Sequence, residues 1–207
     1  MMEIMVRGGP VMWPLLFCSI VALTVIIERA LFWIRESRHR DEDRLDRLLD
    51  LAQKGDFARA LEESAASGDA PTRTIRAGLL HREHGLREAM EVAAGEEMAR
   101  MKKGMAILDT IITMAPLLGI LGTVTGIIKS FDLLGAMQIE DPRGVATGIS
   151  EALLTTAAGL IIALGTLLPF NYFISRIQQE SRRLEQLATQ FEVAYRKGCA
   201  RETDQRV

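Results

Sequence analysis

A single acidic side chain inside a long uncharged stretch is the feature of this sequence that points most directly to chemistry. Residues 144–175 contain no charged side chain other than Glu151. Acidic side chains in membrane helices commonly face the interior of a helix bundle or a water-filled path. We therefore interpret Glu151 as part of an ion pathway. The alternative is a carboxylate at the end of a span that reaches the water of the lipid headgroup layer.

Three threonines in the same apolar surroundings are the other candidates for a polar path. Thr155 follows Glu151 by four residues, so the two side chains share one face of a helix. Thr156 is the only hydroxyl on an otherwise apolar face, and Thr123 lies in the preceding apolar stretch. An isolated hydroxyl in an apolar lining is typical of a narrow, partly hydrated ion path, although a threonine can also bond to its own helix. These four residues form the predicted ion pathway.

Three blocks without charges predict the helices that hold these side chains. The blocks comprise residues 11–27, 110–128 and 152–175. A bilayer core is crossed by about 20 helical residues, so each block is a candidate membrane span. Trp13 and Trp33 are separated by about 30 Å of helix and are expected to anchor the first span at the two membrane interfaces. The sequence therefore predicts an all-α membrane protein with three transmembrane helices extended into a cytoplasmic helical bundle.

Small residues recur at three- and four-residue spacing along the second and third spans. In lipid, such rows let two helix backbones approach closely, because packing replaces the hydrophobic effect as the driving force. Packing alone is the more common role of these residues, and it needs no ion path. The glycines of the predicted helix-packing seam are Gly119, Gly122, Gly126, Gly148 and Gly159.

The uneven distribution of lysine and arginine predicts the orientation of the chain. Residues 35–105 and 176–207 are rich in these side chains, whereas the N-terminal segment has only Arg7 and the loop after the second span only Arg143. Positively charged segments remain in the cytoplasm. The predicted order is an outer N-terminus at 1–10, transmembrane helix 11–34, a cytoplasmic helical domain at 35–104, transmembrane helix 105–132, an outer loop at 133–144, transmembrane helix 145–175 and a cytoplasmic C-terminal helix and tail at 176–207.

Local signals predict where the helices of the cytoplasmic part begin and end. Gly55 and Asp56 predict a helix stop followed directly by the N-cap of the next helix. Residues 86–115 contain no proline, so we expect one helix to run from the cytoplasmic domain into the second span without a break. The third span is expected to continue as a helix through residues 177–195.

Several functional classes lack support in this sequence. The 25 basic and 27 acidic residues give a net charge of −2 and no polycationic segment for nucleic acid. Cys18 and Cys199 form no metal or redox pattern, and His81 and His84 stand without further ligands nearby, so neither a metal site nor a cofactor is expected. The sequence shows no nucleophile–base set and no nucleotide loop. We therefore expect a protein that is not an enzyme.

Two segments of the spans resemble the MotA/TolQ/ExbB proton-channel family, most closely its ExbB and TolQ branch. They are residues 115–131 (APLLGILGTVTGIIKSF) and residues 148–160 (GISEALLTTAAGL). A weaker element is Glu28-Arg29 after an opening Gly8-Gly9-Pro10. Three spans with a cytoplasmic domain between the first two also fit this branch, whereas the flagellar stator branch has four spans.

The resemblance implies a pentamer in the bacterial inner membrane that encloses the single transmembrane helices of an ExbD- or TolR-like dimer. The outer segments would then face the periplasm. The partner would supply the aspartate that carries ions, which fits the lack of a carboxylate in the middle of any span here. Thr123 and Thr156 would line the path near that aspartate, and Glu151 would lie near its outer end. Thr155 stands where proton-driven members can have alanine, which leaves sodium coupling open.

We therefore expect a subunit of an ion-driven motor that uses the proton gradient, with sodium left open. It would energise outer-membrane transport or envelope maintenance through its ExbD- or TolR-like partner and a TonB- or TolA-like protein. The alternative is a non-conducting membrane scaffold that recruits proteins through its cytoplasmic helices. The scaffold predicts that Glu151 and the threonines tolerate apolar replacement, whereas the motor predicts that they do not.

Overall fold

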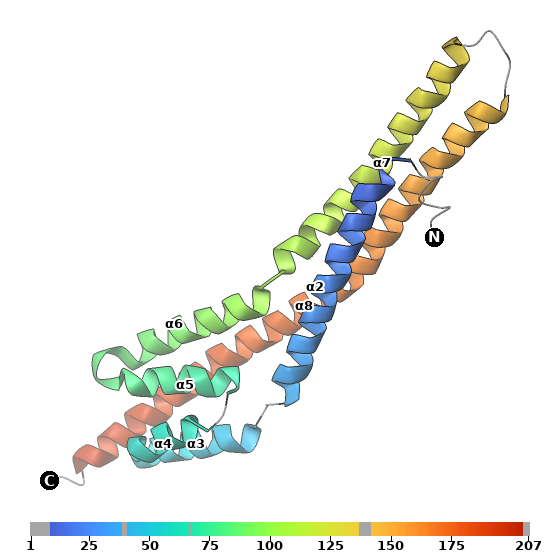
Figure 1. Ribbon diagram of the computed structural model, residues 1–207. Helices are drawn as coiled ribbons and strands as arrows, with labels where there is room; N and C mark the ends of the chain where they lie inside the picture. Colours follow the sequence, from blue (N-terminus) through green and yellow to red (C-terminus); the bar gives the residue numbers. More distant parts are fainter. Residues whose placement is uncertain (1–8, 39–40, 67, 137–141, 205–207) are drawn as a thin grey trace. The chain divides into compact units, whose positions relative to one another are not determined.

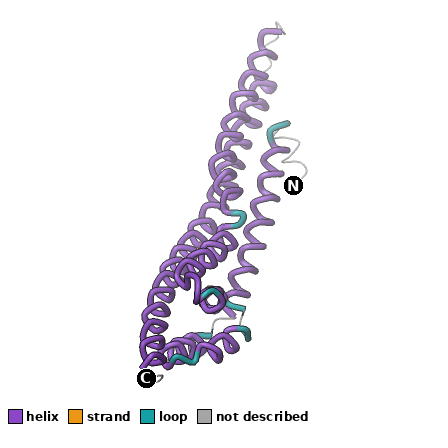
Figure 2. The backbone as a smooth tube through the Cα atoms, turned by 90° about the vertical axis from the view of Figure 1, so that its left-hand side faces the viewer, coloured by secondary structure: helices purple, strands orange, loops and turns teal. Residues whose placement is uncertain are grey.

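In a computed structural model of the chain, the described residues, 9–38, 41–66, 68–136 and 142–204, form helices joined by short loops (Figures 1 and 2). No strand occurs within these ranges, which confirms the all-helical prediction for them. Most of the predicted outer N-terminal segment and residues 137–141 of the predicted outer loop lie outside the described residues. The helices are α2 (Met12–Arg38), α3 (Glu42–Lys54), α4 (Phe57–Ser64), α5 (Ala70–Leu80), α6 (Arg82–Lys102), α7 (Met105–Ala136) and α8 (Pro142–Asp204).

The chain divides into two compact units. The first unit comprises Met1–Ala30 and Gly104–Phe173, and the second comprises Leu31–Lys103 and Ile174–Val207. Three helices, α2, α7 and α8, contain windows that are long and apolar enough to cross a membrane. Within the described residues, each of the three predicted spans therefore corresponds to a helix of sufficient length and apolar composition.

The prediction that one continuous helix runs from the expected cytoplasmic domain into the second span is wrong. α6 ends at Lys102, and α7 begins at Met105. Gly104 lies between them with a φ of 79°. This left-handed conformation ends an α-helix, and glycine adopts it without the steric cost of a Cβ atom. By contrast, α8 continues through residues 177–195 as predicted.

The first unit exposes much of its apolar surface. Many large apolar side chains of α7 and α8 point outward instead of packing against other parts of the chain. In α7 the most exposed are Leu117, Ile128 and Phe131, and in α8 they are Leu153, Ile161, Leu164 and Leu168. Contiguous apolar surfaces of this kind mark contacts with lipid or with other membrane helices. We therefore expect lipid or other membrane helices to cover the apolar surface of this unit.

The second unit has a hydrophobic core of its own. It is formed by buried side chains from α3, α4, α5, α6 and the last third of α8, namely Leu45, Leu48, Ala52, Phe57, Ala60, Ile75, Leu79, Leu86, Met90, Phe191 and Ala194. Gly55 ends α3 with a φ of 82°, and the Asp56 carboxylate accepts a hydrogen bond from the backbone N–H of Arg59 at the start of α4. The predicted stop and N-cap at these residues are confirmed.

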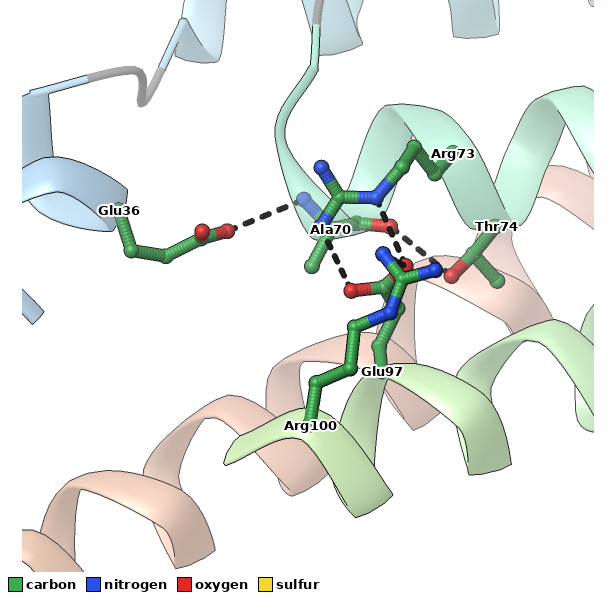
Figure 3. Close-up of polar contacts among 6 residues, drawn as sticks. All are labelled: Glu36, Ala70, Arg73, Thr74, Glu97 and Arg100. Atoms are coloured by element: carbon green, nitrogen blue, oxygen red, sulfur yellow. Dashed lines mark hydrogen bonds and ion pairs between the residues drawn. The ribbon is translucent and has the colours of Figure 1, made fainter. Parts of the chain in front are cut away.

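A polar cluster joins three helices of the second unit (Figure 3). The backbone N–H of Ala70, at the start of α5, donates to the Glu36 carboxylate of α2 at 3.2 Å. Arg73 of α5 donates two hydrogen bonds, of 2.7 and 2.6 Å, to Glu97 of α6, which is 5% exposed. The hydrogen bond to Glu97 raises the pKa of Arg73. Arg100 adds a third bond to Glu97, so the buried carboxylate is well compensated.

The two tryptophans expected at the ends of the first span differ in exposure. Trp13 is 66% exposed, as expected of an interfacial anchor, but Trp33 is only 5% exposed. The guanidinium of Arg176 lies 5.4 Å from the centre of the Trp33 ring. Trp33 therefore packs within the second unit, where a cation–π contact and burial stabilise it. The ring is thus packed against protein, and its position at the inner membrane interface stays a prediction.

Candidate functional site

Close helix packing brings most of the candidate residues to one place, the contact between α7 and α8. In Figure 1 the two helices run side by side in the first unit. A methyl group on Gly159 would lie 2.5 Å from the carbonyl oxygen of Ala115, and one on Gly119 would lie 3.0 Å from the Cα atom of Thr156. These distances leave no room for side chains. The buried glycines at this contact, which we call the α7–α8 seam, are Gly119, Gly122, Gly126, Gly148 and Gly159.

Thr155 fills the seam opposite Gly122. The Thr155 side chain is 1% exposed, and its hydroxyl donates a hydrogen bond to the carbonyl oxygen of Ala152 at 2.8 Å. Any side chain on Gly122 would collide with Thr155. The two residues therefore fit as a small and a larger partner. The Thr155 hydroxyl is turned toward its own helix.

Thr156 links the two helices directly. Its hydroxyl donates to the carbonyl oxygen of Gly119 in α7 at 3.0 Å. The hydroxyl of Thr123 donates to the carbonyl oxygen of Ile120 at 2.6 Å, within α7. Both side chains are half-buried. A hydroxyl that donates to a carbonyl keeps its oxygen lone pairs, so both oxygens can still accept hydrogen bonds from water or coordinate a cation.

Glu151 lies on α8, one turn before Thr155. The Glu151 side chain is 16% exposed, and its Oε2 atom lies 3.6 Å from the Nζ atom of Lys129 in α7. The other side of the carboxylate lies against the backbone of Gly9, where a side chain would collide with it. The carboxylate is therefore confined between an ammonium group and a stretch of backbone. The structure places Glu151 on the same pair of helices as the three threonines.

Lys129 is not among the residues predicted for the site. One signal in the sequence could have identified it, because Lys129 is the only lysine or arginine between Lys103 and Arg143. A lone basic residue near the end of an apolar span can reach the headgroup layer without any partner. Only the rotation of α7 against α8 shows that this one faces a carboxylate.

Residues 45–186 match the model of the MotA/TolQ/ExbB proton channel family. The chain belongs to this family. It is 41% identical over 197 residues to a Synechocystis sp. protein, the putative biopolymer transport protein ExbB-like 1. The aligned residues cover 92% of this chain and 77% of that protein. It is 35% identical over 206 residues to ExbB-like 3 of the same organism, covering 92% of both chains. It is also 34% identical over 108 residues to the Tol-Pal system protein TolQ of Pseudomonas aeruginosa, covering 52% of this chain and 47% of TolQ.

The family match covers the α7–α8 seam completely. All four predicted pathway residues and all five seam glycines fall within residues 45–186, whereas α2 ends before residue 45. Membership of a channel family, together with three helices apolar enough to span a bilayer, identifies a membrane protein. It also makes the contact between the second and third spans the candidate functional site.

Proposed function

We propose that this chain is an ExbB/TolQ-like subunit of an ion-driven motor in the bacterial inner membrane. The observation that carries the proposal is the position of Glu151 and Thr156. Both lie at the contact between α7 and α8, within the residues that match the proton channel family. Relatives named as biopolymer transport and Tol-Pal system proteins support a role in outer-membrane transport or envelope maintenance. The subunit itself would catalyse no reaction.

The proposed ion pathway passes Thr123, Thr156 and Glu151, with Thr155 behind them in the seam. Protons are the ions that we propose. A sodium ion needs several oxygen ligands, and the Thr155 side chain is buried in the seam against Gly122, which keeps its oxygen away from a passing ion. This arrangement supports a packing role for Thr155. It weakens the argument that the extra oxygen of Thr155 helps to bind sodium.

The proposed partners are further copies of this chain in a pentamer, an ExbD- or TolR-like dimer with single spans, and a TonB- or TolA-like protein reached through that dimer. The exposed apolar surface of α7 and α8 supports contacts with other membrane helices. α8 also has an apolar hollow on its surface. The hollow is lined by Ala146, Ile149, Ser150, Leu153, Leu154 and Ala157.

The proposed orientation places the N-terminus in the periplasm and the second unit in the cytoplasm. In a chain with Cys18 and Cys199 replaced by serine, a cysteine at Gln138 should react with a membrane-impermeant thiol reagent in intact spheroplasts. A cysteine at Glu91, whose side chain is 62% exposed, should react only after the membrane is opened. Labelling of the cysteine at Glu91 in intact spheroplasts would overturn this orientation.

Removing the Thr156 hydroxyl tests the ion pathway. Thr156→Val keeps the shape of the side chain but loses the bond to Gly119. We expect ion flux through vesicles that contain the full complex to fall by about tenfold, because losing one polar group in an apolar site costs about 1–3 kcal/mol. The readout is proton flux under an imposed membrane potential.

Thr125→Val is the matched control. Thr125 lies in α7, as Thr123 does, is exposed, and donates to carbonyl oxygens of its own helix, those of Leu121 and Gly122. It loses the same group outside the proposed pathway, so we expect unchanged flux. Parental flux in Thr156→Val and in the corresponding Thr123→Val variant would contradict the channel and favour the non-conducting scaffold.

A further inference from the structure

Lys129 faces Glu151 across the two helices of the seam. The distance from the Lys129 Nζ atom to the Glu151 Oε2 atom is 3.6 Å. Within the described part of the chain, Glu151 is the only acidic group at ion-pair distance from Lys129. Asp132 follows Lys129 by three residues on α7, and it is exposed without such a contact to the lysine. The lysine is therefore directed toward α8 rather than toward the acid on its own helix.

The two partners of this ion pair differ in their surroundings. The Lys129 side chain is 65% exposed, whereas that of Glu151 is 16% exposed. An ion pair between two fully exposed groups contributes little, because water solvates both of them well. A mostly buried carboxylate has fewer ways to be solvated, so the ammonium group is its main compensation. The pair consequently determines where the carboxylate points.

Gly9, which lies just before α2, covers the other side of the carboxylate. Gly9 has a φ of 69°, and the carboxylate of Glu151 occupies the space that a side chain on Gly9 would need. The carbonyl oxygen of Gly9 accepts a hydrogen bond from the N–H of Met12, so Gly9 is tied to the first turn of α2. All three elements belong to the first unit. A cation that binds Glu151 must displace either the ammonium group or this backbone.

We propose that Lys129 is a positioning residue that holds Glu151 in a closed state of the ion pathway. The inference rests on the proposed role of Glu151 in that pathway. In the closed state the carboxylate is paired with Lys129 and covered by Gly9. Ions pass Glu151 only when the ion pair separates, so the pair limits leakage through the resting complex.

The test compares charge-neutral and charge-conserving variants of Lys129 in vesicles that contain the full complex with its partner dimer. Lys129→Gln and Lys129→Met both remove the charge, and Lys129→Met keeps most of the apolar stem. We expect either variant to raise proton flux through the resting complex by about threefold to tenfold, the scale of one weak ion pair. Lys129→Arg keeps the charge and should stay within about twofold of the parent.

A double variant separates a pathway effect from a damaged membrane domain. In a Glu151→Gln background, Lys129→Gln should add nothing, because its effect acts through the carboxylate. A leak that persists in the double variant would overturn the inference by showing a structural defect. Native mass spectrometry should give the parental subunit number for every variant, and loss of assembly in both neutral variants would also overturn the inference.

The outcomes distinguish this inference from the proposed function. If Glu151→Gln reduces energised flux but both neutral variants of Lys129 leak no more than the parent, only the closed state held by Lys129 is refuted. If Glu151→Gln conducts like the parent, the proposed pathway itself fails, and the inference fails with it. Increased resting flux that arginine prevents and that requires Glu151 would establish the role of Lys129.

Discussion

Replacing Gly159 with leucine is expected to separate α7 from α8 and to abolish assembly of the proposed pentamer. Even the Cβ atom of a new side chain would lie 2.5 Å from the carbonyl oxygen of Ala115 and 3.3 Å from the Cα atom of Gly119. These are backbone atoms of the facing helix, so no side-chain rotation can relieve the collision. Overpacking of this kind typically costs about 1–3 kcal/mol, and we expect the upper end here because the neighbours cannot move independently. The measurement is the fraction of assembled protein in mild detergent, by native mass spectrometry.

Gly165→Leu provides the matched control on the same helix. Gly165 lies in α8, and within this chain nothing is close enough to contact a Cβ atom there. The substitution adds the same apolar volume at an open position, and we expect it to change assembly little. Equal assembly of the two variants would show that the α7–α8 seam does not hold the protein together.

The second large effect is expected for Glu151→Gln. Glutamine keeps the volume of the side chain and can still form hydrogen bonds, but it cannot ionise and so cannot form the ion pair with Lys129. We expect the uptake or envelope function driven by the ion gradient to fall by at least about tenfold, since a positioned group that exchanges protons is lost. Glu151→Asp keeps the charge on a shorter stem and should retain part of the activity. The readout is complementation of uptake or envelope integrity, alongside proton flux.

Assembly must remain intact in both Glu151 variants for this result to concern the ion pathway. Glu151 is partly exposed and is not one of the close-packed seam glycines, so neither substitution should prevent α7 and α8 from packing. Full complementation by Glu151→Gln would contradict a role for the carboxylate in ion passage. A result in which glutamine and aspartate fail equally would point to side-chain length rather than ionisation as the property that matters.

The sequence by itself determined the helices, their apolar character and the family. Uncharged blocks of about 20 residues are sufficient to predict membrane spans, because bilayer thickness fixes the required length. The helix stop at Gly55 and the N-cap at Asp56 were predictable because both depend on neighbouring backbone groups alone. The rows of small residues likewise predicted a close helix contact. These features depend on short stretches of chain.

Only the tertiary structure decided which groups face one another. The break at Gly104 interrupts a stretch that sequence pattern alone reads as one helix, because glycine tolerates both helical and left-handed conformations. The partner of Thr156 in α7 depends on how far α8 is rotated about its axis. The pairing of Lys129 with Glu151 depends on the same rotation. The burial of Trp33 under Arg176 joins residues far apart in the chain. Periodicity defines the faces of each helix, but the direction of each face is set by packing between helices.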